Sequence, residues 1–244
     1  NRRHSCNTFW NKSSCKKLVK LIVIISALNE AEVISSVLKS LPKKIKGASV
    51  VEYLVINDGS TDDTEKIAKN LGFKTLTHVI NRGLGAAIKT GIEYAKINNA
   101  DIAVTFDSDG QHNPADIQKI ADPIISRRAD VVIGSRFLKP KDIPFDRLVI
   151  NWVANAITLI LYGSYSTDSQ SGLRAFSKKA LAKINYKADR MDFSSEILLE
   201  VKRNNLLKVE IPINVKYTNY SRTKGQKNLN ALPVFLRLLV RLFR

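Results

Sequence analysis

Cysteine and long apolar runs are both scarce in this sequence. Its two cysteines, Cys6 and Cys15, lie within residues 1–17, and no Cys-x-x-Cys pair or Cys/His cluster occurs. We therefore expect no structural zinc site. The chain after residue 17 has no cysteine, which is consistent with a reducing compartment. No stretch reaches the roughly 18 uninterrupted apolar residues of a membrane-spanning helix. The sequence thus predicts a soluble or a peripheral membrane protein.

Acidic residues are also in deficit, with 22 Asp and Glu against 39 Lys and Arg in 244 residues, a net charge of +17. This excess favours an anionic partner, such as nucleic acid, anionic lipid or a phosphorylated substrate. Residues 1–17 are basic and lack the apolar core of a signal peptide, so we interpret them as a flexible tail. The acidic residues gather at the ends of expected strands, where a nucleic-acid-binding protein would carry basic and aromatic side chains. Nucleic acid is therefore the least favoured partner.

Apolar runs and helical patterns alternate about five times before residue 135, which predicts right-handed βαβ units on a mainly parallel sheet. We expect one α/β domain over residues 18–228, with ligands at the carboxyl ends of its strands. The expected strands are 19–26, 52–57, 74–80, 101–106, 130–133 and 207–215. The expected helices are 30–41, from Thr61 or Asp62 to 71, 85–97, 114–126, 146–162 and 190–204, with loops at 139–145, 163–171 and 217–228.

The last segment, residues 229–244, reads LNALPVFLRLLVRLFR. On a helix, Arg237, Arg241 and Arg244 form one basic stripe, and aliphatic and aromatic residues cover most of the rest. This pattern predicts a helix in the membrane interface whose arginines reach the lipid headgroups. A truncated membrane segment, a core helix and a helix that binds a partner subunit are the alternatives.

Three polar motifs follow expected strands: Asn29-Glu30, Asn57-Asp58-Gly59-Ser60 and Asp107-Ser108-Asp109. In the third motif, two carboxylates two residues apart follow a hydrophobic strand, and Gln111 adds a neutral oxygen nearby. Hard oxygen ligands of this kind suit Mg²⁺ or Mn²⁺, which bridge to phosphate oxygens. Asp58 is a contact to a ribose or base, or else a plain turn and helix cap.

The segment Asn81-Arg82-Gly83-Leu84-Gly85 precedes an expected helix, whose N-terminus can approach an anion. It lacks the third glycine of a dinucleotide-binding loop and the Gly-Lys-Ser/Thr of a P-loop. His112 is interpreted as a turn residue before Pro114, with a direct role at the substrate as the alternative.

Six segments occur in order along the chain: 24–33 (IISALNEAEV), 55–64 (VINDGSTDDT), 81–91 (NRGLGAAIKTG), 106–114 (FDSDGQHNP), 132–137 (VIGSRF) and 171–177 (SGLRAFS). Together they resemble glycosyltransferase family 2, and most closely its polyprenyl-phosphate branch. The resemblance covers about residues 18–230.

The resemblance implies a GT-A fold and an inverting, metal-dependent transfer from a GDP- or UDP-linked sugar to a polyprenyl phosphate, either dolichyl or undecaprenyl. By position, the family's nucleotide-sugar contacts fall on Leu28, Glu30, Asp58, Gly85, Asp107, Ser108, Asp109, Arg222 and Lys227. The acceptor-phosphate contacts fall on Arg136, Arg147, Asn151 and Arg174. The Mg²⁺ or Mn²⁺ ligands fall on Asp107, Asp109 and Gln111, and the catalytic residues on Asp109, Arg136 and Arg147.

The sequence departs from the family pattern at three places. Ser26-Ala27-Leu28 replaces the usual Pro-Thr-Tyr, which leaves the identity of the base open. Asn151 stands where a serine is common. The late basic motif, Arg222 to Lys227, lacks its serine and is one residue short.

The acceptor decides whether a general base is needed. A phosphate is already anionic and needs none, whereas a sugar hydroxyl needs one. A relative that acts on a saccharide or lipid-linked saccharide is therefore the alternative, with Asp192 as its base. In the other interpretation, Asp192 caps a helix and Glu196 pairs with a surface Lys or Arg. We expect the protein to act at the cytoplasmic face of a membrane, where the loop at 139–145 guides the lipid phosphate. A membrane partner subunit or a second copy of the chain is a further possible partner in this interpretation.

Overall fold

The computed structural model describes residues 18–140, 143–190 and 192–216, apart from the side chain of Asp146. The predicted N-terminal tail, the basic loop and the C-terminal helix lie outside these residues, as do the expected nucleotide-sugar contacts Arg222 and Lys227.

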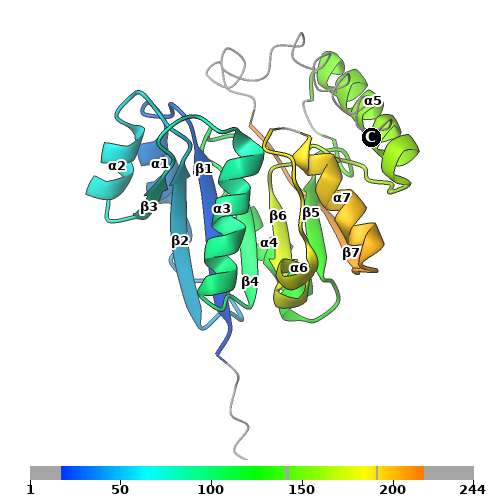
Figure 1. Cartoon of the computed structure of the whole chain (residues 1–244), viewed down its shortest axis with the longest axis horizontal. Helices are drawn as coiled ribbons and strands as arrows, with labels where there is room; N and C mark the ends of the chain where they lie inside the picture. Colours follow the sequence, from blue (N-terminus) through cyan, green and yellow to red (C-terminus); the bar gives the residue numbers. More distant parts are fainter. Residues whose placement is uncertain (1–17, 141–142, 191, 217–244) are drawn as a thin grey trace, which may run out of the picture.

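Seven strands form one sheet in the order β3-β2-β1-β4-β6-β5-β7 (Figure 1). The pairs β1–β2, β1–β4, β2–β3 and β5–β7 are parallel, which confirms the mainly parallel sheet. Strand β6, which the sequence did not predict, runs antiparallel between β4 and β5. The strands are β1 (Lys20–Ala27), β2 (Val50–Asn57), β3 (Lys74–Thr77), β4 (Ile102–Asp107), β5 (Val131–Ser135), β6 (Arg174–Ser177) and β7 (Lys208–Pro212).

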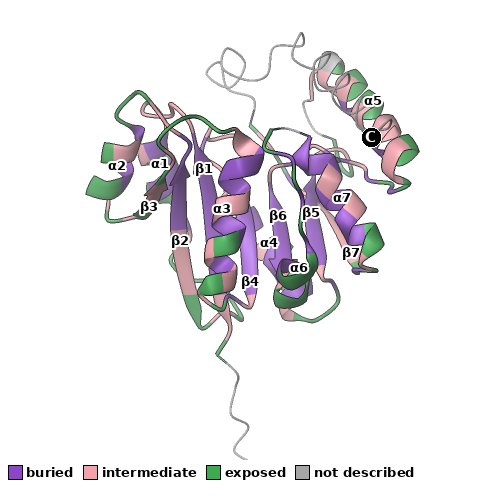
Figure 2. Cartoon of the chain, in the orientation of Figure 1, coloured by how far each residue is buried: buried purple, intermediate pink, exposed green. Residues whose placement is uncertain are grey.

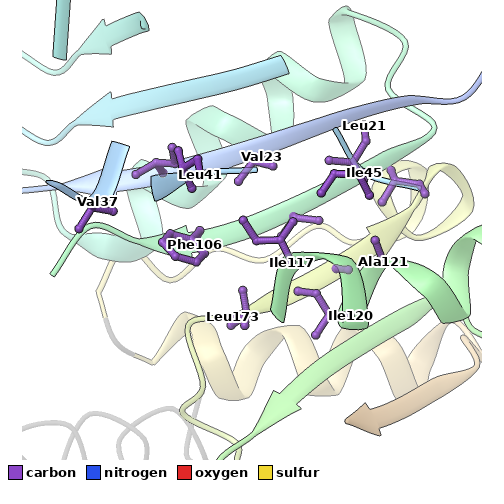
Figure 3. Close-up of a cluster of buried hydrophobic side chains, with 14 of the residues drawn as sticks. Leu21, Val23, Val37, Leu41, Ile45, Phe106, Ile117, Ile120, Ala121 and Leu173 are labelled. Carbon is purple, nitrogen blue, oxygen red and sulfur yellow. The ribbon is translucent and has the colours of Figure 1, made fainter. Parts of the chain in front are cut away.

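Six helices cover the two faces of the sheet and enclose one apolar core on each side. On β1, Leu21 and Val23 point into one core while Ile22 and Ile24 point into the other, as expected for a strand buried on both faces. Figure 3 shows the first core, where side chains from α1 and α4 meet β1 and β4. On that face lie α1 (Ile34–Ser40), α2 (Thr64–Asn70) and α4 (Asp116–Ile125), and on the other α3 (Leu84–Ile97), α6 (Lys178–Lys183) and α7 (Phe193–Arg203).

Helix α5 (Phe145–Tyr162) belongs to neither core. It lies beside α7 at the β7 end of the sheet (Figure 1), and of its described side chains only Asn151 and Thr158 are buried. Figure 2 shows exposed and half-buried residues along most of its length. Within the described residues, no helix is long and apolar enough to cross a membrane.

Several predicted boundaries differ from the observed ones, and local hydrogen bonds explain two of the differences. Helix α1 begins at Ile34 rather than at 30, because Asn29 is left-handed (φ 53°) and the next residues form a turn closed on the carbonyl of Glu30. Strand β3 ends at Thr77 rather than at 80, because the chain turns at His78 to bind Asp58.

Candidate functional site

The loops that follow β1 and β2 are bonded to each other at the carboxyl edge of the sheet. The Asn29 N–H donates to Ser60 Oγ (2.9 Å), and the Glu30 N–H donates to Thr64 Oγ1 (2.7 Å). The left-handed backbone of Asn29 allows this close approach. Leu28 and Glu30, both predicted to bind the nucleotide sugar, are therefore held half-buried in this loop.

The turn after β4 holds the two predicted metal carboxylates. Ser108 Oγ donates to the Ser26 carbonyl (2.7 Å), which fixes the turn to the end of β1, and Ser26 Oγ donates to Asp107 Oδ1 (3.4 Å). Asp109 accepts both the backbone N–H (3.0 Å) and the side-chain amide (2.7 Å) of Gln111. The structure thus brings Asp107, Asp109 and Gln111 together, as the sequence predicted.

The two carboxylates of this turn differ in their electrostatics. Burial opposes ionisation of Asp107, but the hydrogen bond and charge of His112 (Nε2 to Oδ2, 3.4 Å) and the charge of Arg136 outweigh it and lower its pKa. For Asp109, burial and the negative charge of Asp107 raise the pKa. Two carboxylates that repel each other form a site that a cation would stabilise.

Gly172 is a site residue that motif reasoning did not assign. Its carbonyl accepts from Thr105 Oγ1 (2.6 Å), so the loop before β6 presses against the end of β4. A Cβ atom at Gly172 would lie 1.9 Å from Asp107 Oδ2. Only glycine leaves room there for the carboxylate.

A second unassigned residue, Asp168, holds the predicted acceptor residue Arg136. The two side chains form a bidentate pair (Nε to Oδ2 and Nη2 to Oδ1, both 2.7 Å), and the Arg136 backbone N–H also donates to Asp168 (3.1 Å). Asp168 is fully buried, whereas the Arg136 side chain is 22% exposed. The guanidinium is therefore fixed in one orientation, although the side chain as a whole stays partly exposed.

The loop at 163–171 carries Asp168 and is held by polar contacts. Thr167 Oγ1 bonds to Ser135 Oγ (2.7 Å) and to Glu210, and its carbonyl accepts from the amides of Asn151 (2.9 Å) and Asn155 (2.8 Å). Asn151, an expected acceptor contact, thus holds this loop with its nitrogen. Its Oδ1 is buried and has no partner in the structure.

Arg174 does not lie where an acceptor could reach it. It is 1% exposed, and its guanidinium donates to the carbonyls of Ser169 (2.8 Å), Ser171 (2.9 Å) and Ser194 (3.1 Å). Burial lowers its pKa to about 10, which still leaves it charged at neutral pH. Arg174 therefore supports the loop beneath Asp168, which corrects the expected acceptor role.

Asp58 and Gly85 both make contacts within the protein itself. Asp58 is buried and accepts from the His78 ring (2.7 Å) and from the backbone N–H groups of Arg82 (3.0 Å) and Gly83 (2.7 Å). The anion held before α3 is thus the protein's own carboxylate, not a phosphate. A Cβ atom at Gly85 would lie 2.4 Å from the carbonyl of residue 188, so this glycine serves close packing. The predicted nucleotide contacts of both residues gain no support.

The structure also shows the positions of Arg147, Asp192 and Glu196, for which the sequence suggested roles. Arg147 is half-buried in the first turn of α5. Asp192, the alternative general base, is 5% exposed at the start of α7. Glu196 accepts the backbone N–H groups of Lys187 and Ala188 rather than serving only a surface pair.

The chain returns to the carboxylate turn after β7. The Lys216 N–H donates to the Gln111 carbonyl (2.9 Å), and Val215 forms an antiparallel bridge with His112. The last described residue therefore lies beside the predicted metal ligands.

Comparisons with known proteins agree with this geometry. Residues 22–184 match the model of a family described as Glycosyl transferase family 2. The UDP-N-acetylglucosamine–dolichyl-phosphate N-acetylglucosaminyltransferase of Methanococcus voltae is 39% identical over 244 aligned positions, covering 91% of this chain and 96% of that protein. The polyprenol monophosphomannose synthase of Mycolicibacterium smegmatis is 30% identical over 210 positions, covering 80% and 76%.

Solved structures share the fold. Glucosyl-3-phosphoglycerate synthase from Mycobacterium tuberculosis, crystallised with Mn²⁺, UDP and glucosyl-3-phosphoglycerate, superposes with a TM-score of 0.67 at 20% identity, covering 90% of this chain and 80% of that one. At this identity the likeness establishes the GT-A arrangement of sheet and helices, as the sequence predicted.

Proposed function

The chain belongs to glycosyltransferase family 2, and on that premise we propose that it transfers a sugar from a nucleotide sugar to a polyprenyl phosphate. The observation that carries the choice of acceptor is Arg136. Its guanidinium is fixed by the buried Asp168, its side chain is partly exposed, and its positive charge helps to lower the pKa of Asp107. A cation held in this way beside the carboxylate turn suits an anionic acceptor.

The donor in this proposal is a UDP-linked sugar. The Methanococcus voltae relative is named for UDP-N-acetylglucosamine and dolichyl phosphate, which makes that donor the first to test. The half-buried Leu28 and Glu30 line the loop where the family's base and ribose contacts fall. Arg222 and Lys227, which follow Lys216 in sequence, are proposed to contact the diphosphate.

The carboxylate turn fits a divalent cation. Among the residues that the structure describes, no group of three or more His, Cys, Asp or Glu side chains is placed to hold a metal ion. Asp107, Asp109 and Gln111 would instead supply part of the ligand set and leave positions for the diphosphate and water, as Mg²⁺ and Mn²⁺ prefer. When bound, the ion would offset the charge that develops on the leaving diphosphate.

The transfer itself needs no general base from the protein. An oxygen of the acceptor phosphate forms the new bond to the anomeric carbon as the bond to the nucleoside diphosphate breaks, and that diphosphate keeps the electron pair. A single displacement inverts the anomeric configuration. Arg136 and Arg147 are proposed to orient the acceptor phosphate, which arrives already deprotonated. The buried Asp192 then has no role as a base.

The experiment offers the purified chain UDP-N-acetylglucosamine, Mn²⁺ and a short polyprenyl phosphate, with the product identified by mass spectrometry. Matched reactions contain the corresponding polyprenol, which lacks the phosphate, or a saccharide. We expect transfer to the phosphate alone, with inversion at the anomeric carbon. Transfer only to a hydroxyl acceptor would contradict the proposal and favour the alternative in which Asp192 is the base.

A further inference from the structure

Helix α5 reverses the usual orientation of a surface helix, because polar side chains contact the protein and an apolar face points outward. Its buried side chains are polar: Thr158 bonds to Ser195 Oγ of α7 (2.9 Å), and Asn151 and Asn155 bond to the loop at 163–171. Its outward side chains are apolar, although a surface helix ordinarily turns its apolar stripe to the core. The outward residues are Phe145, Leu148, Val149, Trp152, Val153, Leu159 and Ile160, with Phe145 and Ile160 both 79% exposed and Trp152 72% exposed.

This outward stripe follows one face of the helix for its whole length. Positions 145, 148, 149, 152 and 153 recur at intervals of three and four, and 159 and 160 extend the row. Eighteen residues make a stripe about 27 Å long. Asp146 and Arg147 are the only charged residues in the helix sequence, and both precede the stripe's centre.

We infer that α5 lies on a lipid surface, with its outward stripe, defined by the seven apolar residues above, buried at the boundary between headgroups and acyl chains. The inference rests on the proposed function, because a polyprenyl phosphate is presented at such a surface. The first turn of α5 carries Arg147, a proposed acceptor contact. Stripe and site are therefore parts of one element, and docking the stripe brings the acceptor arginines to the headgroup plane.

The charges beside the stripe favour anionic lipid over a second copy of the chain. Arg147 marks one end, the exposed Lys139 precedes it, and Lys202 of α7 lies against Gly163 at the other end. Two copies joined symmetrically through this stripe would bring positive ends together. An anionic lipid surface is complementary to both ends, and Trp152 and Phe145 suit the region just below the headgroups.

The experiment measures vesicle binding by the full chain with Trp152 as a reporter. The chain has two tryptophans, so Trp10→Phe leaves Trp152 alone. We expect its emission to lie near that of exposed tryptophan in buffer, and to shift to shorter wavelength with vesicles of phosphatidylglycerol and phosphatidylcholine. Vesicles of phosphatidylcholine alone should bind more weakly, because they lack the anionic charge.

Two isoleucines give a matched pair for flotation with the same vesicles. Ile160 is 79% exposed at the end of α5, and Ile97 is 78% exposed at the end of α3. We expect Ile160→Ser to weaken partitioning about tenfold and Ile97→Ser to leave it unchanged.

Three results would overturn the inference. Equal flotation of the two serine variants is the first. The second is a Trp152 emission already at short wavelength in buffer and unmoved by vesicles, which would mean that protein covers the stripe. The third is a dimer in sedimentation that Ile160→Ser dissociates. Flotation requires no turnover, so a failed transfer assay with intact vesicle binding would count against the proposed reaction and not against the docking surface.

Discussion

Helices α3 and α5 differ in which face they turn to the protein, although both follow a loop at the carboxyl edge of the sheet. Helix α3 buries apolar and small residues, including Ala87, Ile88 and Ile92, in the core beside β1. Helix α5 buries Asn151 and Thr158 and exposes seven of its large apolar residues. Helix α3 thus packs on the sheet through apolar side chains, whereas helix α5 packs through hydrogen bonds and exposes an apolar face.

The largest expected effect comes from placing the same polar residue in both helices. Ile88→Ser should lower the free energy of unfolding by about 3–5 kcal/mol, and Tm by roughly 10 °C, because it removes a buried side chain and buries a hydroxyl. Ile160→Ser should change Tm by less than about 2 °C. Differential scanning calorimetry measures both. A comparable loss in Ile160→Ser would mean that α5 packs against protein, and the contrast between the helices would disappear.

The second prediction tests the proposed metal site in the turn after β4. Asp107→Asn should reduce kcat at least about 100-fold and abolish the strengthening of UDP binding by Mn²⁺, because it removes an ionised metal ligand. Tm should change by less than about 4 °C, since Asp107 lies at a partly exposed strand end. Calorimetric titration with UDP measures binding. Asp122→Asn, at an exposed position, is the control. The site assignment is contradicted if UDP binding is unaffected both by Mn²⁺ and by Asp107→Asn.

The third prediction tests Asp168 as a positioning residue for Arg136. Asp168→Asn should raise the KM for polyprenyl phosphate about 10- to 30-fold and leave the KM for the nucleotide sugar unchanged, because only Arg136 loses its bidentate partner. In an Arg136→Ala background, the same change should add less than about twofold. Steady-state kinetics with each substrate varied measures the split. A general loss of structure would raise both KM values and would persist without Arg136.

The smallest expected effect concerns Glu210, whose carboxylate accepts from Thr167 under the same loop. Burial raises the pKa of Glu210, but the Thr167 hydrogen bonds outweigh it, so the folded pKa lies below the unfolded value of 4.5. Its contribution to the free energy of unfolding is therefore complete above pH 4.5 and is lost as pH falls through the folded pKa. Urea unfolding from pH 7 to pH 3 should show a shallower acid loss in Glu210→Gln. An unchanged slope would remove Glu210 from the network.

The sequence was most informative where strands are buried on both sides. Runs such as LIVII predict strands without any partner being known, and the carboxylates Asp107 and Asp109 were placed correctly because they directly follow such a run. Strand β6 was missed because its four residues, RAFS, show no period and depend on β4 and β5 for their conformation.

Contacts distant in sequence were beyond prediction. Nothing in the loop at 163–171 indicates that Asp168 pairs with Arg136, or that Gly172 makes room for Asp107. Asp58 was expected at a ligand because it ends a strand, but donors 20 to 25 residues away use its carboxylate. For α5, the sequence predicted a helix over 146–162, but that prediction did not say which face turns inward.

The position of β6 also sets an order of assembly during synthesis. Strand β5 pairs only with β6 and β7, both later in the chain, and the outer edge of β4 is closed only when β6 arrives. From residue 107 to residue 177, the end of β6, the ribosome adds 70 residues, which at 5–20 residues per second takes about 4–14 s. During that interval the nascent sheet of β1 to β4 presents an open strand edge, the kind of surface that chaperones shield from neighbouring chains.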